Sequence, residues 1–144
     1  MFDIRLDRRG RESDALGELT IGAHRESFLS DLSFWDVEDY EASWLRGAAH
    51  LLEHGYGRFL LTVSAPGQQM YAAWICRTRD SEARLHKALM LTSTTVGYRG
   101  PEEAENPPED YAARLDEEPS LIVHRCPLRA IADFETRLRH AAAH

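Results

Sequence analysis

The stretch Leu32-Ser-Phe-Trp-Asp-Val-Glu-Asp-Tyr-Glu-Ala-Ser-Trp44 says most about how this chain folds, because it predicts where the first helix begins. Asp36 is a favourable N-cap and Asp39 falls at the third helical position, so both carboxylates can accept hydrogen bonds from free backbone N–H groups. We therefore expect a helix to begin at Val37 and to end at Gly55, a residue type suited to a left-handed C-cap.

One face of this expected helix is apolar. Apolar residues recur along it at intervals of three and four, at Val37, Tyr40, Trp44, Ala48, Leu51 and Leu52. That spacing gathers their side chains in one stripe, which predicts a face that packs on the rest of the protein. Trp35, directly before the N-cap, is placed to pack on Tyr40 as a hydrophobic staple.

Alternating apolar residues predict strands on both sides of the helix. Phe2, Ile4 and Leu6 alternate with charged residues and predict an N-terminal strand, and a second short strand is expected over Leu19 to Ala23. Three segments of strand composition follow the helix, separated by turn-like stretches: Arg58 to Ser64, Met70 to Thr78 and Arg84 to Thr92. Their spacing favours an antiparallel meander with the second segment in the middle, although the third is also compatible with a helix by propensity.

The chain is expected to close with a strand and a second helix. Ser120 to Arg125 has strand composition, and Pro127 begins a helix whose apolar stripe is formed by Leu128, Ile131, Phe134 and Leu138. Together the elements predict an α+β fold, an antiparallel β-sheet with the N-terminal-half helix and the C-terminal helix packed on it. With no repeat or boundary visible, residues 1–144 are expected to form a single domain.

Composition narrows the classes of function. The 24 acidic and 17 basic residues give a net charge of -7, which opposes direct nucleic-acid binding. No apolar run reaches the roughly 18 residues of a membrane span, and no signal peptide is evident, so a cytoplasmic protein with no membrane partner is expected. Cys76 and Cys126 are expected to be free thiols in strand contexts, and the chain to be a monomer or a weak dimer.

The sequence His50-Leu-Leu-Glu53-His54 has the H-x-x-E-H spacing of inverted zinc peptidases. Two histidines four residues apart share a helix face, so a small metal-dependent hydrolase using His50, Glu53 and His54 is the alternative function. Such a site needs a further ligand from another helix, however, and here the motif falls in the last turn before Gly55. The favoured interpretation is a helix-end histidine, with no metal and no cofactor.

Other catalytic signatures are not found. The chain has no G-x-S-x-G elbow, glycine-rich phosphate loop or paired CxxC, so it is not expected to be an enzyme. His24, His86 and His124 lie on expected strands, and an acid–base role for one of them with Glu26 stays open because the sequence supplies no geometry. The three tryptophans, Trp35, Trp44 and Trp74, are expected to be structural, with Trp74 between helix and sheet.

A long acidic loop over 93–119 carries the most credible binding role. It lacks periodicity, contains four of the chain's six prolines and two glycines, and holds eight acidic residues against two arginines. A solvated loop is the commoner explanation of such a segment. The binding interpretation is a negative surface that covers a basic active-site cleft. Its expected contact residues are Glu102, Glu103, Glu105, Glu109, Asp110, Glu117 and Glu118.

The pattern Trp35-x-x-x-Asp39-Tyr40-x-x-x-Trp44, preceded by Phe28, Leu29, Leu32, Ser33 and Phe34, resembles the immunity proteins of contact-dependent growth inhibition (CDI) systems. The resemblance covers roughly Ile21 to Leu138 and includes Arg58-Phe59-Leu60, the strand around Trp74, and the closing strand and helix. The chain departs from the family in two places. The middle strand has one tryptophan where the family often has a pair, and the acidic loop does not match.

The resemblance implies a cytoplasmic protein that binds the C-terminal toxin domain of a cell-surface or secreted effector, commonly a nuclease. The function expected from it is immunity in bacterial competition: neutralisation of a cognate toxin C-terminal domain of a CDI or related polymorphic toxin system. It transfers no individual contact residue, because the shared motif is mostly structural. A generic adaptor domain with an unrelated partner is a third interpretation that the sequence alone does not separate from immunity.

Overall fold

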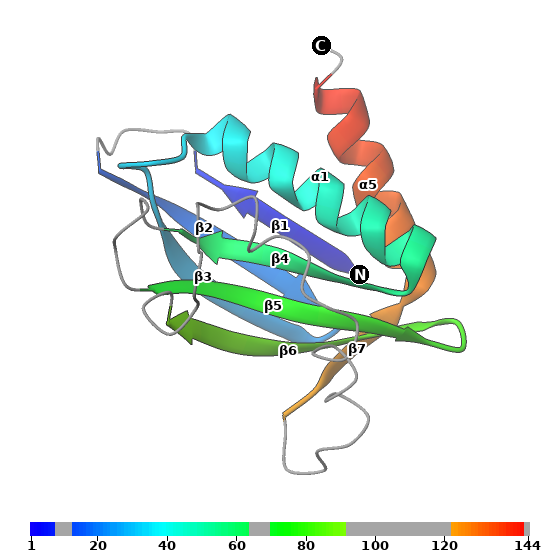
Figure 1. The fold of residues 1–144 in the computed structure, drawn as a ribbon. Coiled ribbons are helices and arrows are strands. Elements are labelled where there is room, and N and C mark those ends of the chain that lie inside the picture. Colours follow the sequence, from blue (N-terminus) through cyan, green and yellow to red (C-terminus); the bar gives the residue numbers. More distant parts are fainter. Residues whose placement is uncertain (8–12, 64–69, 92–121, 143–144) are drawn as a thin grey trace.

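The computed structural model describes residues 1–7, 13–63, 70–91 and 122–142, which hold seven strands and two helices (Figure 1). In chain order the elements are β1 (Phe2–Leu6), β2 (Asp14–Ile21), β3 (His24–Asp31), α1 (Val37–His54), β4 (Tyr56–Thr62), β5 (Met70–Arg79), β6 (Glu82–Leu91), β7 (His124–Pro127) and α5 (Leu128–Ala142). None of the helices in the described part of the chain is both long and apolar enough to cross a membrane.

The strands form two antiparallel sheets, which confirms the α+β class and shows how it is built. Sheet A has the order β1-β2-β3 and sheet B the order β4-β5-β6-β7. The predicted meander is confirmed with β5 in the interior of sheet B, and the segment of ambiguous propensity is strand β6. The last strand begins at His124 rather than near Ser120, and Ile122 and Val123 before it are not strand.

The N-terminal sheet is larger than the sequence indicates. The second strand begins at Asp14, well before Leu19, and it is followed by β3, of which only His24 was expected to lie on a strand. Along β3 the less exposed positions alternate, but they include His24, Glu26 and Ser30. Because these inward residues are polar, the usual apolar alternation is absent and the strand is hard to recognise.

Helix α1 begins and ends where its capping residues predict. The Asp39 backbone N–H donates to the Asp36 carboxylate over 2.8 Å, and the Asp36 N–H donates to the Asp39 carboxylate over 3.1 Å, completing a capping box. At the other end Gly55 has φ 86°, and its N–H donates to the Leu51 carbonyl. Tyr40, Trp44, Ala48 and Leu51 of the stripe are buried, Val37 is partly buried, and Leu52, at the edge of the stripe, is 37% exposed.

The tyrosine and tryptophan of α1 tie the helix to the strands beside it. Trp44 Nε1 donates to the Leu60 carbonyl of β4 over 2.7 Å. The Tyr40 hydroxyl donates to the Asp31 carbonyl over 2.6 Å and accepts from the Val63 backbone N–H over 3.0 Å. The expected staple is present, since the rings of Trp35 and Tyr40 pack edge to face with centroids 5.2 Å apart. Figure 1 shows α1 running along β4 with α5 beside it.

The core lies where both sheets and both helices meet. Phe2 of β1, Phe59 of β4 and Phe134 of α5 form a ring cluster, with Phe2 centroids 5.0 Å from each of the other two. All three side chains are almost completely buried. Burying such rings supplies much of the hydrophobic stabilisation of a chain of this size.

Candidate functional site

The seven acidic contact residues expected from the sequence lie within 92–121, outside the residues that the structure describes. They are Glu102, Glu103, Glu105, Glu109, Asp110, Glu117 and Glu118. Their contact with a partner therefore stays a prediction.

The zinc-like motif occupies the last turns of α1. His50 Nδ1 lies 2.7 Å from the Tyr56 carbonyl oxygen, so that nitrogen is engaged by the backbone. The rings of His50 and His54 are 4.5 Å apart, and Glu53 lies 3.9 Å from His54 Nε2. Within the described ranges no three histidine, cysteine or acidic side chains gather in a way that could hold a metal ion, and no ligand from another helix joins this pair.

A different cluster of titratable side chains forms where the two sheets meet, and we call it the inter-sheet cleft. It has a volume of about 360 Å³ and is lined by His24, Glu26, Trp74, His86, Lys87, Ile122 and His124. His24 and Glu26 alternate along β3, and Trp74 on β5 is the direct cross-strand partner of Lys87 on β6. Residues of sheet A are thus brought against residues of sheet B.

Glu26 is the hub of this cleft. Its carboxylate accepts a hydrogen bond from Trp74 Nε1 over 3.0 Å and lies 3.5 Å from Lys87 Nζ. His24 Nε2 is also 3.5 Å away, without the alignment of a hydrogen bond. The Glu26 side chain is only 20% exposed, so these neighbours compensate a largely buried charge. Trp74 therefore faces β3 of sheet A, and the expectation that it lies between helix and sheet was wrong.

Two histidines stack across the cleft. The rings of His24 and His124 are nearly parallel, with centroids 4.0 Å apart, and both lie beside the Trp74 indole. Burial lowers the pKa of His124, and the neighbouring His24 lowers it further, against the opposing effect of Glu26. Burial also lowers the pKa of His86. The imidazoles of His124 and His86 are therefore mainly neutral at pH 7.

The cleft lacks a nucleophile among its described lining residues. These include no serine, threonine or cysteine. The two cysteines of the chain are free and buried elsewhere, on β5 and β7, as the sequence predicts for free thiols. Burial raises the pKa of Cys126 to about 11 and raises that of Cys76 as well, so neither is a thiolate at neutral pH.

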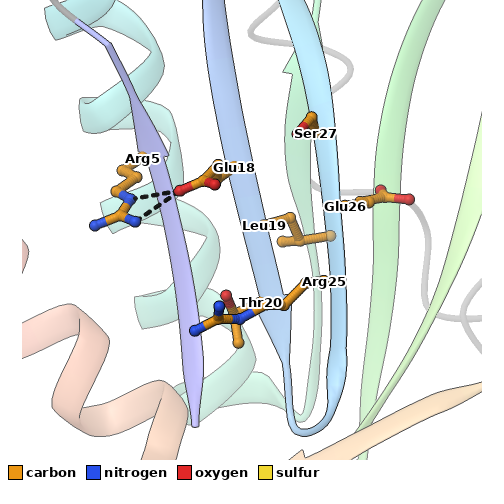
Figure 2. Close-up of a pocket in the computed structure, with 7 residues that line it drawn as sticks. All are labelled: Arg5, Glu18, Leu19, Thr20, Arg25, Glu26 and Ser27. Carbon is orange, nitrogen blue, oxygen red and sulfur yellow. Dashed lines mark hydrogen bonds and ion pairs between the residues drawn. The ribbon is translucent and has the colours of Figure 1, made fainter.

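The outer face of sheet A is the second candidate surface (Figure 2). Arg5 of β1 donates twice to one carboxylate oxygen of Glu18 on β2, over 2.6 and 3.2 Å, beside a shallow cavity of about 200 Å³. Figure 2 shows Arg25 of β3 at the same cavity. On the same face Leu16 and Leu29 are direct cross-strand partners, and they are 49% and 50% exposed. The two leucines form a small exposed apolar patch beside the Arg5–Glu18 ion pair.

The sequence indicated single members of the inter-sheet cleft but not the cluster. His24, Glu26 and His124 were considered for an acid–base role, and the structure does bring them together. The histidines, however, stack on each other and Glu26 is held by Trp74 and Lys87. His24 and His124 are a hundred residues apart and belong to different sheets, so only the fold reveals their contact.

Comparison with known proteins gives a fold match. No family model and no curated protein matches the chain. Among solved structures, a chain of the "CdiA-CT/CdiI toxin and immunity complex from Enterobacter cloacae" superposes with a TM-score of 0.79 at 18% sequence identity. The match covers 97% of this chain and 99% of that chain. The resemblance to CDI immunity proteins is thereby confirmed at the level of the fold: this chain folds like a component of a CDI toxin and immunity complex.

Proposed function

We propose that this chain is an immunity protein, which binds and neutralises the cognate toxin domain of a CDI or related polymorphic toxin system. The observation that carries the proposal is the fold match along almost the whole of both chains. The Trp35-to-Trp44 motif supports it independently, because it resembles immunity proteins in residues that form the N-terminal cap and buried face of α1.

The proposed mechanism is stoichiometric occlusion. The partner is the toxin's C-terminal domain, in our proposal a nuclease, and the complex forms in the cytoplasm, where an incoming toxin would act. A nuclease active site is shaped for phosphates and is commonly basic, so carboxylates of an acidic protein compete for it. The chain's net charge of -7 supports this, and Glu102, Glu103, Glu105, Glu109, Asp110, Glu117 and Glu118 are the proposed contact residues.

The described titratable cluster is consistent with a binding role. In the inter-sheet cleft Glu26 is held by Trp74 and Lys87, and the imidazoles of His24 and His124 stack on each other. General acid–base catalysis instead requires a group positioned to reach the proton of a substrate. We therefore assign the chain an inhibitory and not a catalytic role.

The decisive experiment uses the toxin domain encoded next to this chain. We expect the full chain to co-purify with that domain in a one-to-one complex and to protect cells that express it. Failure both to bind and to protect would refute the proposal. An unrelated CDI toxin domain serves as the specificity control, and it should be neither bound nor neutralised.

Two sets of variants locate the contact surface. Reversing charges in the acidic loop, for example Glu102→Arg with Glu103→Arg, should weaken toxin binding at least tenfold if those carboxylates enter the toxin's cleft. Leu16→Ser with Leu29→Ser tests the outer face of sheet A without changing net charge. Loss of binding in the second set alone would move the interface to sheet A and contradict the acidic contact residues, while leaving the immunity role intact.

A further inference from the structure

The Glu26 carboxylate in the inter-sheet cleft has one oxygen with an open acceptor position. Its Oε1 accepts the hydrogen bond from Trp74 Nε1 over 3.0 Å and lies 3.5 Å from Lys87 Nζ. Its Oε2 lies 3.5 Å from His24 Nε2 and accepts no hydrogen bond from any residue in the described part of the chain. The side chain is only 20% exposed, so water compensates this oxygen poorly. A donor that reached Oε2 would therefore bind well.

The nitrogen that faces this oxygen is open as well. His24 Nε2 is buried and has no hydrogen-bond partner. When the ring is neutral and carries its proton on Nδ1, Nε2 is an acceptor. Two acceptors 3.5 Å apart then face the same space. They suit a group with two parallel N–H donors, and among protein side chains the arginine guanidinium has that fork geometry.

The rings around these two acceptors suit a flat cation. His24 and His124 stack with centroids 4.0 Å apart and planes 19° apart, and the Trp74 indole lies within 5.9 Å of both. Guanidinium groups stack favourably on planar π-systems of this kind. At the rim Ile122 is 79% exposed, the most exposed of the large apolar side chains that the structure describes. It offers apolar contact to the stem of a long side chain.

Lys87 occupies the cleft only loosely. Its ammonium lies 3.5 Å from Glu26 Oε1, and its side chain is 50% exposed. A half-exposed ion pair of this kind contributes little to stability, so a second cation can displace it. The cleft itself has a volume of about 360 Å³, at the small end of the roughly 300–1,000 Å³ typical of ligand sites. That size suits one side chain better than a larger ligand.

We propose that the inter-sheet cleft receives one arginine side chain of the cognate toxin domain. The guanidinium donates to Glu26 Oε2 and His24 Nε2, stacks on the imidazole pair and moves Lys87 aside. This site rests on the proposed immunity function, because the toxin domain supplies the arginine. Charge supports the choice of occupant, since a chain of net charge -7 attracts a basic partner. An arginine enclosed in a pocket is typical of the residues that dominate binding energy at protein interfaces.

Binding of the purified toxin domain to Glu26→Gln tests the site. The amide keeps the size of the side chain and an acceptor for Trp74 Nε1, but it removes the charge. We expect the dissociation constant to rise about tenfold or more. Asp80→Asn is the matched control, because it removes one negative charge at the exposed β5–β6 turn, and it should change the constant by no more than about twofold. Equal constants for the two variants would refute the site.

Lys87→Met gives a result of opposite sign. If Lys87 competes with the incoming arginine for Glu26, its removal should tighten toxin binding about threefold. Arg129→Met, at an exposed position of α5, makes the same change in net charge and should have a smaller effect. Weaker binding by Lys87→Met than by Arg129→Met would mean that the cleft does not take a cation, and would overturn the proposal. This measurement also decides the matter if Glu26→Gln fails to fold.

A double-mutant cycle identifies the arginine. Each arginine of the toxin domain is changed to glutamine and measured against the parent chain and against Glu26→Gln. One of them should weaken binding to the parent about tenfold and have almost no effect on binding to Glu26→Gln. If the parent binds the toxin domain but no arginine couples to Glu26, the cleft assignment is wrong and the immunity function stands. If the parent does not bind at all, the immunity function fails and this site fails with it.

Discussion

Tyr40 joins three parts of the chain through one hydroxyl group. The hydroxyl donates to the carbonyl at the end of β3 and accepts from the Val63 N–H just after β4, while its own ring belongs to α1. Burial raises the pKa of Tyr40 to about 12, so the group remains a neutral donor at any physiological pH. Tyr40, which belongs to the motif that resembles the immunity family, therefore has a structural role.

We expect Tyr40→Phe to destabilise the protein by about 1–3 kcal/mol, because it leaves a buried N–H and a partly buried carbonyl unpaired while the ring still fills its site. Urea unfolding followed by circular dichroism measures the change. Tyr56→Phe is the matched control. Tyr56 is only partly buried and its ring contact with His50 survives the change, so the loss there should be about 0.5 kcal/mol or less. Equal losses in both variants would contradict the role assigned to Tyr40.

At the scale of elements, α1 sits unusually close to β4. A Cβ atom at Gly47 would collide with the Arg58 carbonyl oxygen of β4, and one at Gly57 would lie 2.9 Å from the Gly47 carbonyl oxygen. The two glycines thus let a helix and a strand approach backbone to backbone. In this position glycine is required by packing, although it disfavours helix formation.

We therefore expect Gly47→Ala to destabilise the protein by roughly 1–3 kcal/mol, because the added methyl group forces α1 away from β4. In an open helix the same change would be stabilising by about 1 kcal/mol. Thermal unfolding shows whether Gly47→Ala lowers or raises the stability of the protein. Ala42→Gly, at an exposed position of the same helix, isolates helix propensity and should cost only about 1 kcal/mol. A Gly47→Ala variant more stable than the parent would contradict the close approach.

The contact between β3 and β7 should make stability depend on pH. The folded-state pKa of His124 is lowered, so the unfolded chain binds its proton more readily, and the stabilisation is complete above the ordinary value of about 6.5. It is lost as pH falls below that value, since a charged His124 would be partly desolvated and would stand beside His24, with Glu26 as the opposing charge. Part of the dependence comes from His86, whose pKa is also lowered by burial.

Urea unfolding between pH 5.5 and 7.5 measures this effect. We expect His124→Phe, which keeps a stacked ring, to reduce the slope of the free energy of unfolding against pH. His140→Phe, on the exposed end of α5, should leave the slope unchanged. The same slope in the parent and in His124→Phe would show that this contact does not titrate.

Sequence reasoning succeeds here where the signal is local. Asp36 and Gly55 cap α1 by short-range geometry, so its limits follow from the sequence. The bounds of strand β3 could not be predicted, because its inward residues, such as Glu26, are polar and their partners lie in another sheet. The inter-sheet cleft could not be predicted for the same reason. The acidic contact residues come from composition alone and remain a prediction.

For the whole molecule, net charge should control how fast the proposed complex forms. With a charge of -7 on this chain and a basic toxin domain, the association rate constant should fall steeply as salt rises from 50 to 500 mM. The dissociation rate constant should change much less. Stopped-flow fluorescence measures both rates, with sucrose at matched viscosity as the control. An association rate constant that does not change with salt would show that long-range electrostatic attraction does not steer the two proteins together.

In the described part of the chain each strand ladder pairs strands of one sheet only, and the two sheets are bridged by hydrogen bonds from Ser30 to the Leu61 carbonyl and from the Asp31 N–H to Thr62. We therefore expect one ladder to open without breaking the other. We expect the amides of β2, central in sheet A, to exchange with deuterium as one cooperative group, at a rate distinct from those of β5. Native-state hydrogen exchange would then resolve two unfolding units within one small protein, and a single common rate would show that they open together.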